Sequence, residues 1–88
     1  MSATSAKVRH EGRCRNCGSR VDLQAAHTIP RSLGGKSHAD SVIPLCATCH
    51  RLQHDRRLEL LPLMNIREQI AAVNAVGLAR AYRYLTNQ

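Results

Sequence analysis

The chain has 88 residues, the length of one small domain. It contains no Phe, no Trp and only 2 Tyr, and so small a core favours a staple such as a bound metal. The formal net charge is +7 and 11 of the 13 basic residues are Arg, which favours a polyanionic partner such as nucleic acid over a generically basic surface. No apolar run approaches the roughly 20 residues that span a bilayer, and the N-terminus lacks the apolar centre of a signal peptide. We therefore expect a cytoplasmic protein with no membrane partner.

Changes in composition divide the chain into three parts. Residues 1–12 are Ser, Ala, Thr and basic residues without periodicity, which predicts a flexible basic tail. Residues 13–57 carry the recognisable motifs and are predicted to form the core of the domain. Residues 58–88 are predicted to be a helical extension that packs on this core.

Short strands and one short helix are predicted inside the core. Residues 21–30 alternate with a period near two, which predicts a strand that stops at Pro30. Gly34 and Gly35 then predict a turn. The apolar segment 41–46 predicts a second short strand or an extended segment, and residues 47–56, which lack Gly and Pro, predict a short helix.

The C-terminal part has a clear helix start. Asn65 followed by Glu68 predicts an Asn cap, and the region beyond it is predicted to be one helix or two helices broken at Gly77. Four apolar residues fall near one helical face, and we expect them to pack in the core, with a dimer or partner surface as the alternative: Ile66, Ile70, Val73 and Ala81. The chain is accordingly expected to be a monomer or a weak homodimer.

Four cysteines form two C-x-x-C pairs. Cys14 and Cys17 are followed after 28 residues by Cys46 and Cys49, the ordinary arrangement of a structural zinc site. Four ligands leave no open position, so this Zn²⁺ is predicted to be structural, with free or disulfide-bonded cysteines as the alternative. Neighbouring arginines are expected to lower the thiol pKa values: Arg13, Arg15 and Arg51.

Two histidines follow the second pair directly. His50 and His54 lie four residues apart on the predicted helix, so they share one face and could bind a divalent metal ion. Two solvated surface histidines are the alternative. His27, on the predicted first strand, would alone be interpreted as a hydrogen-bonded core histidine.

The combination of these motifs changes that interpretation. The segments CRNCGS, AHTIPRSLGG and SVIPLCATCHRLQH, which extend from Cys14 to His54, resemble the HNH endonuclease family. The resemblance implies a small α+β, zinc-stapled domain with a ββα-metal (His-Me finger) core and C-terminal helices. More weakly, LELLP and the tail ending in GLARAYRYLT are similar to small stand-alone HNH proteins of phages and actinobacteria. This similarity implies a bacterial or phage-infected host cell and a role beside a phage packaging terminase or another protein partner.

The resemblance also implies the role of each site residue. His27 would be the general base that takes a proton from the attacking water. His50 and His54 would hold the catalytic divalent metal, which is Mg²⁺, Mn²⁺, Ni²⁺ or Zn²⁺, and stabilise the leaving 3′ oxygen. Cleavage of DNA would leave a 5′ phosphate. The nearest cations for mostly sequence-independent backbone contacts are Arg31, Arg51, Arg56 and Arg57.

Two positions depart from the family pattern. Ala26 stands where a third metal ligand is common, and Ser41 stands where the family has the Asn that holds the loop of the base. Three residues are candidates for a substitute ligand: His38, Asp40 and Asp55. The sequence thus predicts a metal-dependent endonuclease of low sequence specificity, with two alternatives, a zinc-stapled DNA-binding module without cleavage and a protein-interaction subunit.

Overall fold

The centre of the molecule is an antiparallel hairpin. The structure, a computed structural model, describes residues 2–34 and 38–87. Strand β1 (Leu23–His27) pairs with β2 (Val42–Cys46), so both predicted strands are confirmed. Of the predicted turn between them, Gly34 adopts a positive φ of 107°, whereas Gly35 lies outside the described residues.

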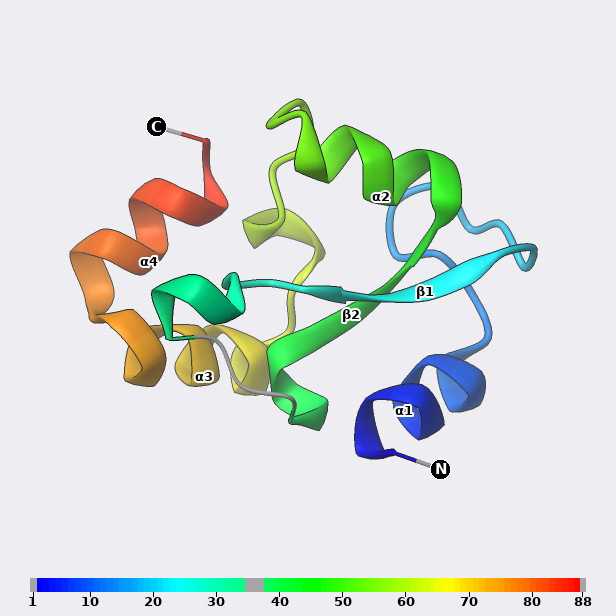
Figure 1. Ribbon diagram of the computed structural model, residues 1–88, viewed down its shortest axis with the longest axis horizontal. Helices are drawn as coiled ribbons and strands as arrows, with labels where there is room; N and C mark the ends of the chain where they lie inside the picture. The colour runs from blue at the N-terminus through cyan, green and yellow to red at the C-terminus, as the bar shows by residue number, and fades with distance from the viewer. Residues whose placement is uncertain (1, 35–37, 88) are drawn as a thin grey trace.

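Helices cover both faces of this hairpin (Figure 1). Helix α2 (Ala47–His54) follows β2 directly and packs on one side, and α1 (Ala3–Glu11) packs on the other. Helices α3 (Ile66–Val76) and α4 (Leu78–Leu85) pack on each other at one end of the sheet, and their separation at Gly77 decides between the two predicted alternatives in favour of two helices. The described residues also form three short 3₁₀ turns: Arg31–Leu33, Ala39–Ser41 and Leu61–Leu63.

Coverage of both faces explains the composition of β2. All five of its residues are buried, which is why the strand is a continuous apolar run. Pro44 fits inside β2 because Pro44 and its register partner Ala25 form a non-hydrogen-bonded pair. In such a pair the backbone nitrogen of Pro44 points away from β1, so no ladder hydrogen bond is lost. The Pro44 carbonyl on that outer edge accepts a hydrogen bond of 2.9 Å from the Arg15 backbone N–H. The loop between α1 and β1 that carries Cys14 and Cys17, which we call the first cysteine loop, is thereby held against the sheet.

The prediction of a flexible tail over residues 1–12 is wrong. The Ser2 hydroxyl caps α1 by accepting from the Ser5 N–H, and Gly12 ends the helix in the left-handed region with φ 67°. Val8 is buried against the hairpin. Lys7 donates to the backbone carbonyls of Ala39 and Val42, at 2.7 and 2.8 Å, and also pairs with Glu68. The helix is therefore fixed by contacts that no local pattern could show.

Glu68 is a fully buried carboxylate at the meeting point of three segments. It completes the capping box predicted at Asn65, whose side chain accepts from the Glu68 N–H at 2.9 Å. Its carboxylate also accepts two hydrogen bonds from Arg15, each of 2.8 Å, and one from Lys7. Glu68 thus ties α3 to α1 and to the first cysteine loop.

The predicted apolar face of α3 is corrected. Ile66 and Ile70 are 66% and 53% exposed, whereas Ala81 is buried and Val73 packs partly against the core. Helix α3 turns Glu68 and Ala72, which lie four residues apart, toward the interior, and this rotation places both isoleucines outside. Within the described residues, no helix is long and apolar enough to cross a membrane.

Candidate functional site

The four cysteines meet at one place, as predicted. Cys14 and Cys17 come from the loop after α1, Cys46 ends β2, and Cys49 lies in the first turn of α2. Their Sγ atoms all lie within 4.8 Å of one another, and none forms a disulfide. The Sγ atoms of Cys17 and Cys46 are 3.7 Å apart, close to the edge of about 3.8 Å expected for a tetrahedron with Zn–S bonds of about 2.3 Å. This cluster could hold a metal ion.

Backbone groups, not arginines, control the first thiol. Burial acts to raise the pKa of Cys14, but hydrogen bonding from the backbone at Cys17, Cys46 and Asn16 outweighs it and lowers the pKa to about 6. For Cys49, the Asn16 amide acts to lower the pKa, whereas burial and the neighbouring thiols raise it to about 12. The side chain of Arg15 is engaged with Glu11 and Glu68, so its predicted effect on the thiols is corrected.

His50 and His54 are arranged as a pair of nitrogen ligands. Their Nε2 atoms lie 3.2 Å apart on adjacent turns of α2. Nδ1 of His50 meets Oε1 of Gln24, on β1, at 2.5 Å, so Nδ1 carries the hydrogen and Nε2 keeps its lone pair. Burial, with smaller effects of His54 and His27, lowers the pKa of His50 and favours this neutral form. The sequence analysis missed Gln24, although its place on β1 opposite α2 is the signal that could have found it.

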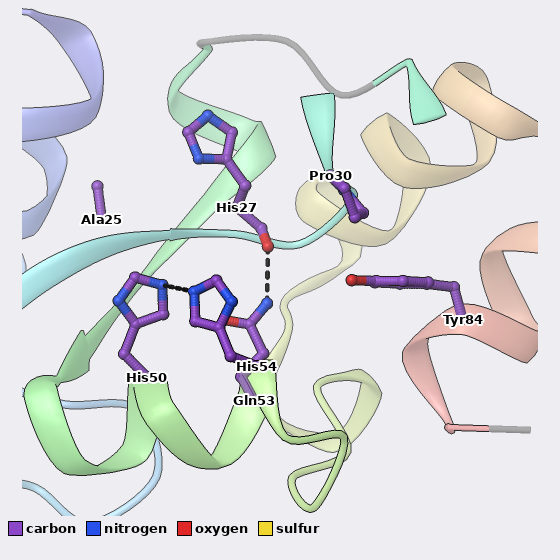
Figure 2. A pocket seen from close by; sticks show the side chains of 7 residues that line it. All are labelled: Ala25, His27, Pro30, His50, Gln53, His54 and Tyr84. Atoms are coloured by element: carbon purple, nitrogen blue, oxygen red, sulfur yellow. Dashed lines mark hydrogen bonds between the residues drawn. The ribbon is translucent and has the colours of Figure 1, made fainter. Parts of the chain in front are cut away.

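His27 borders the same pocket but does not join this pair. Side chains alternate along a strand, so His27 projects from the opposite face to Gln24, and Figure 2 shows its ring on the side of β1 away from α2. Within residues 2–34 and 38–87, its Nε2 is buried without a hydrogen-bond partner. Its carbonyl accepts a 2.8 Å hydrogen bond from Gln53 of α2, which fixes the end of the strand (Figure 2).

A pocket of about 330 Å³ brings these groups together at the outer edge of β1. On β1 the pocket is bordered by Ala25 and His27, whose side chains share one face of the strand, whereas the residues from α2 lie on the other side of the strand (Figure 2). Helix α4 contributes one residue, Tyr84, that the sequence analysis did not single out. The lining consists of Ala25, His27, Pro30, His50, Gln53, His54 and Tyr84 (Figure 2).

The two positions that depart from the family pattern, Ala26 and Ser41, both make contacts that stabilise the fold. Ala26 is fully buried and pairs in register with Ile43, so it lies inside the core. The Ser41 carbonyl accepts from the backbone N–H and the hydroxyl of Thr28, at 3.0 and 3.2 Å. Thr28, which the sequence analysis overlooked, therefore ties the segment after His27 to the start of β2.

Within the described residues, none of the three candidate substitute ligands completes a group at metal-binding distance with the histidine pair. His38 accepts from the Asp40 N–H, and Asp40 lies 3.7 Å from Arg67, so both belong to the turn beside α3. Asp55 borders a second hollow with His50 and His54. Among the described residues, only the four cysteines form a group of three or more potential ligands at metal-binding distance.

The predicted cationic residues lie on different parts of the surface. Arg51 borders the second hollow beside His50, and Arg31 lies in the turn after β1. Arg56 and Arg57 follow α2. The side chains of all four are exposed, as phosphate contacts require.

These features place two C-x-x-C pairs, the end of β1 and the histidine helix in a single ββα unit. The HNH endonuclease family matches residues 14–56. The resemblance expected from the sequence is thereby confirmed for this part, which we call the HNH segment and which covers just under half of the chain. It indicates a nuclease-type or nucleic-acid-binding function. Comparisons with curated proteins and with solved structures gave no significant match.

Proposed function

We propose that this protein is a metal-dependent HNH endonuclease that hydrolyses DNA phosphodiester bonds with low sequence specificity. The observation that carries the proposal is the pair of Nε2 atoms, 3.2 Å apart, on the pocket that His27 also borders. With metal–nitrogen distances of about 2.1 Å, this separation corresponds to an angle of about 100° at a shared ion, which suits two adjacent coordination positions.

Two metal ions with different tasks fit the donor sets. The cysteine cluster would hold structural Zn²⁺, and the pair of His50 and His54 would hold a catalytic divalent ion, Mg²⁺, Mn²⁺, Ni²⁺ or Zn²⁺. When bound at the histidines, that ion supplies charge neutralisation at the scissile phosphate and at the leaving 3′ oxygen. Gln24 holds His50 with the lone pair of Nε2 directed toward His54.

The remaining chemistry belongs to the chain itself. His27 would take a proton from the water that attacks phosphorus, and the phosphodiester bond to the 3′ oxygen would break, leaving a 5′ phosphate. Its Nε2, which has no hydrogen-bond partner among the described residues, supports this role, because a buried ring nitrogen is ordinarily hydrogen-bonded and a bound water would supply the partner. Gln53 fixes the His27 carbonyl, and the bonds from Thr28 to Ser41 fix the following segment, so the base is held from both sides.

DNA recognition would rest mainly on the phosphate backbone. The four predicted cations, Arg31, Arg51, Arg56 and Arg57, are exposed but belong to short turns and to the end region of one short helix, so few side chains are available to read base edges. A role beside a phage packaging terminase stays a prediction from the resemblance alone.

The test is cleavage of supercoiled plasmid with Mg²⁺, Mn²⁺, Ni²⁺ or Zn²⁺. We expect nicking by the wild type, a loss of about 100-fold or more in His27→Ala, and a comparable loss in His50→Ala. His10→Ala is the matched control, because His10 is an exposed histidine on α1, away from the pocket. Equal inactivity of the wild type and His27→Ala with every metal would refute the endonuclease.

The second candidate is a zinc-stapled DNA-binding module that does not cut. Two observations favour it: Ala26 supplies no third ligand, and the ring of His27 lies across β1 from the histidine pair (Figure 2). It predicts salt-sensitive binding that His50→Ala leaves unchanged, together with inactivity in every metal.

A further inference from the structure

Tyr84 lies outside the HNH segment yet lines the pocket. It comes from α4, and Figure 2 shows its hydroxyl end directed into the pocket, toward Pro30 and Gln53. Within the part of the chain that the structure describes, this hydroxyl has no hydrogen-bond partner. A partly buried phenol with a free donor, directed into a pocket that histidine and glutamine side chains also line, is suited to an incoming acceptor.

Arg56 is held on the same tyrosine. Its guanidinium lies over the Tyr84 ring at 4.1 Å from the centroid, and its Nη2 donates to the Tyr84 carbonyl at 3.0 Å. The backbone of Arg56 is itself fixed at the end of α2. Arg56 adopts a positive φ of 59°, and its N–H donates to the Gln53 carbonyl. Among the described residues no carboxylate pairs with Arg56, so most of its donors are free.

We propose that Tyr84 and Arg56 form a binding element for the phosphate backbone of nucleic acid at the mouth of the pocket. The Tyr84 hydroxyl donates to one phosphate oxygen, and its ring holds the guanidinium of Arg56 toward the same or the next phosphate. Helix α4 is then part of the nucleic-acid site. The inference rests on the proposed function only in taking the pocket as the place where nucleic acid binds.

A purely structural role is the competing explanation. Arg56 also covers a carbonyl near the C-terminal end of α4, where cations stabilise a helix, so its contacts could serve folding alone. The two roles differ in salt dependence. A phosphate contact adds about one to the slope of log K against log salt, whereas a helix cap adds nothing.

The experiment measures binding of a short fluorescein-labelled DNA duplex by fluorescence anisotropy over a series of NaCl concentrations. All variants carry His27→Ala, and no divalent metal is added, so that the duplex stays intact. Arg56→Ala is expected to weaken binding about tenfold and to lower the salt slope by about one. Tyr84→Phe, which keeps the ring, is expected to weaken binding about tenfold with the slope nearly unchanged.

Matched controls on α4 isolate these effects. Tyr82→Phe removes the same hydroxyl from an exposed tyrosine outside the pocket, and Arg80→Ala removes the same charge from an exposed position; both are expected to bind like the parent. Circular dichroism checks that each variant is folded. Because Arg56 is exposed, Arg56→Ala is expected to fold even if a larger change at Tyr84 does not.

Each outcome decides the inference separately from the nuclease. If the variants show these losses of binding, and the wild type does not cleave plasmid with any of the four metals, the binding element is supported and the endonuclease is refuted. A chain that cuts, but whose binding and salt slope are the same in Arg56→Ala and Arg80→Ala, refutes the binding element alone. Absence of binding to the duplex at low salt overturns it as well.

Discussion

Replacement of Glu68 by Gln tests how much the buried carboxylate stabilises the fold. The Glu68 carboxylate accepts from Lys7, twice from Arg15, and once from the Asn65 N–H at 2.8 Å. Gln keeps one acceptor oxygen but places an NH₂ group against Lys7 Nζ and Arg15 Nη2, so two charge-assisted hydrogen bonds are lost. At about 1.5–3 kcal/mol each, and with both cations partly solvated, we expect a loss of about 3 kcal/mol.

Urea unfolding followed by circular dichroism measures this change. A small domain has only about 5–15 kcal/mol of stability in total, so the midpoint should fall sharply at unchanged slope. Glu59→Gln is the matched control, because Glu59 is exposed, and its effect should stay within about 0.5 kcal/mol. If Glu68→Gln changed the free energy of unfolding no more than Glu59→Gln does, the reasoning would be refuted.

The same variant gives a signature in pH. Burial acts to raise the pKa of Glu68, but hydrogen bonds from Arg15 and Lys7 outweigh it, so the pKa in the folded state lies below the usual value of about 4.3. The contribution of Glu68 is therefore complete above that value and is lost as pH falls through the folded pKa. The stability difference between wild type and Glu68→Gln should shrink below about pH 4. A difference that grew on acidification would contradict this assignment.

Three further predictions concern the metal sites. Gln24→Ala should weaken Ni²⁺ binding at His50 and His54 about 10- to 100-fold, measured by calorimetry, whereas Gln24→Glu should bind at least as tightly as wild type. If Gln24→Ala bound Ni²⁺ as tightly as wild type, Gln24 would have no role in positioning His50. Cys46→Ser, or a strong chelator, should unfold the domain in circular dichroism, although Ser is a good helix cap at this position; loss of activity with the fold intact would exclude a structural metal. Ala26→Asp buries a carboxylate and should lower the thermal midpoint, with partial recovery on adding Ni²⁺; no recovery would contradict the alignment with the family's third ligand.

Local signals were sufficient wherever the cause was local. The strands, the start of α2 and the Asn65 cap were predicted, and a break at Gly77 was one of two predicted alternatives, because alternation, capping and glycine act within a few residues. Grouping of the cysteines followed from their spacing, and the family match then confirmed the resemblance over residues 14–56.

Errors arose where a distant partner decides the outcome. Helix α1 is held by Glu68, 61 residues after Lys7, so residues 1–12 gave no sign of order on their own. In α3 the buried face is centred on Glu68. A prediction from hydrophobicity therefore chose the wrong face of the helix, the one that carries Ile66 and Ile70. Likewise, alternation along β1 places Gln24 and His27 on opposite faces, but motif spacing could not show that α2 packs on the face of Gln24, since this depends on the tertiary arrangement of the helix.

The direct passage from β2 into α2 fixes the rotational phase of the helix. Cys46 ends the strand and Cys49 lies one turn later, so the cysteine cluster holds α2 in one orientation about its axis. His50 follows immediately, and each added residue turns a helix by about 100°. One alanine inserted between Cys49 and His50 would leave all four cysteines in place yet rotate both histidines away from Gln24 and the pocket. The cysteine cluster thus sets the direction in which both histidines project, and the spacing between Cys49 and His50 cannot change without moving them out of the pocket.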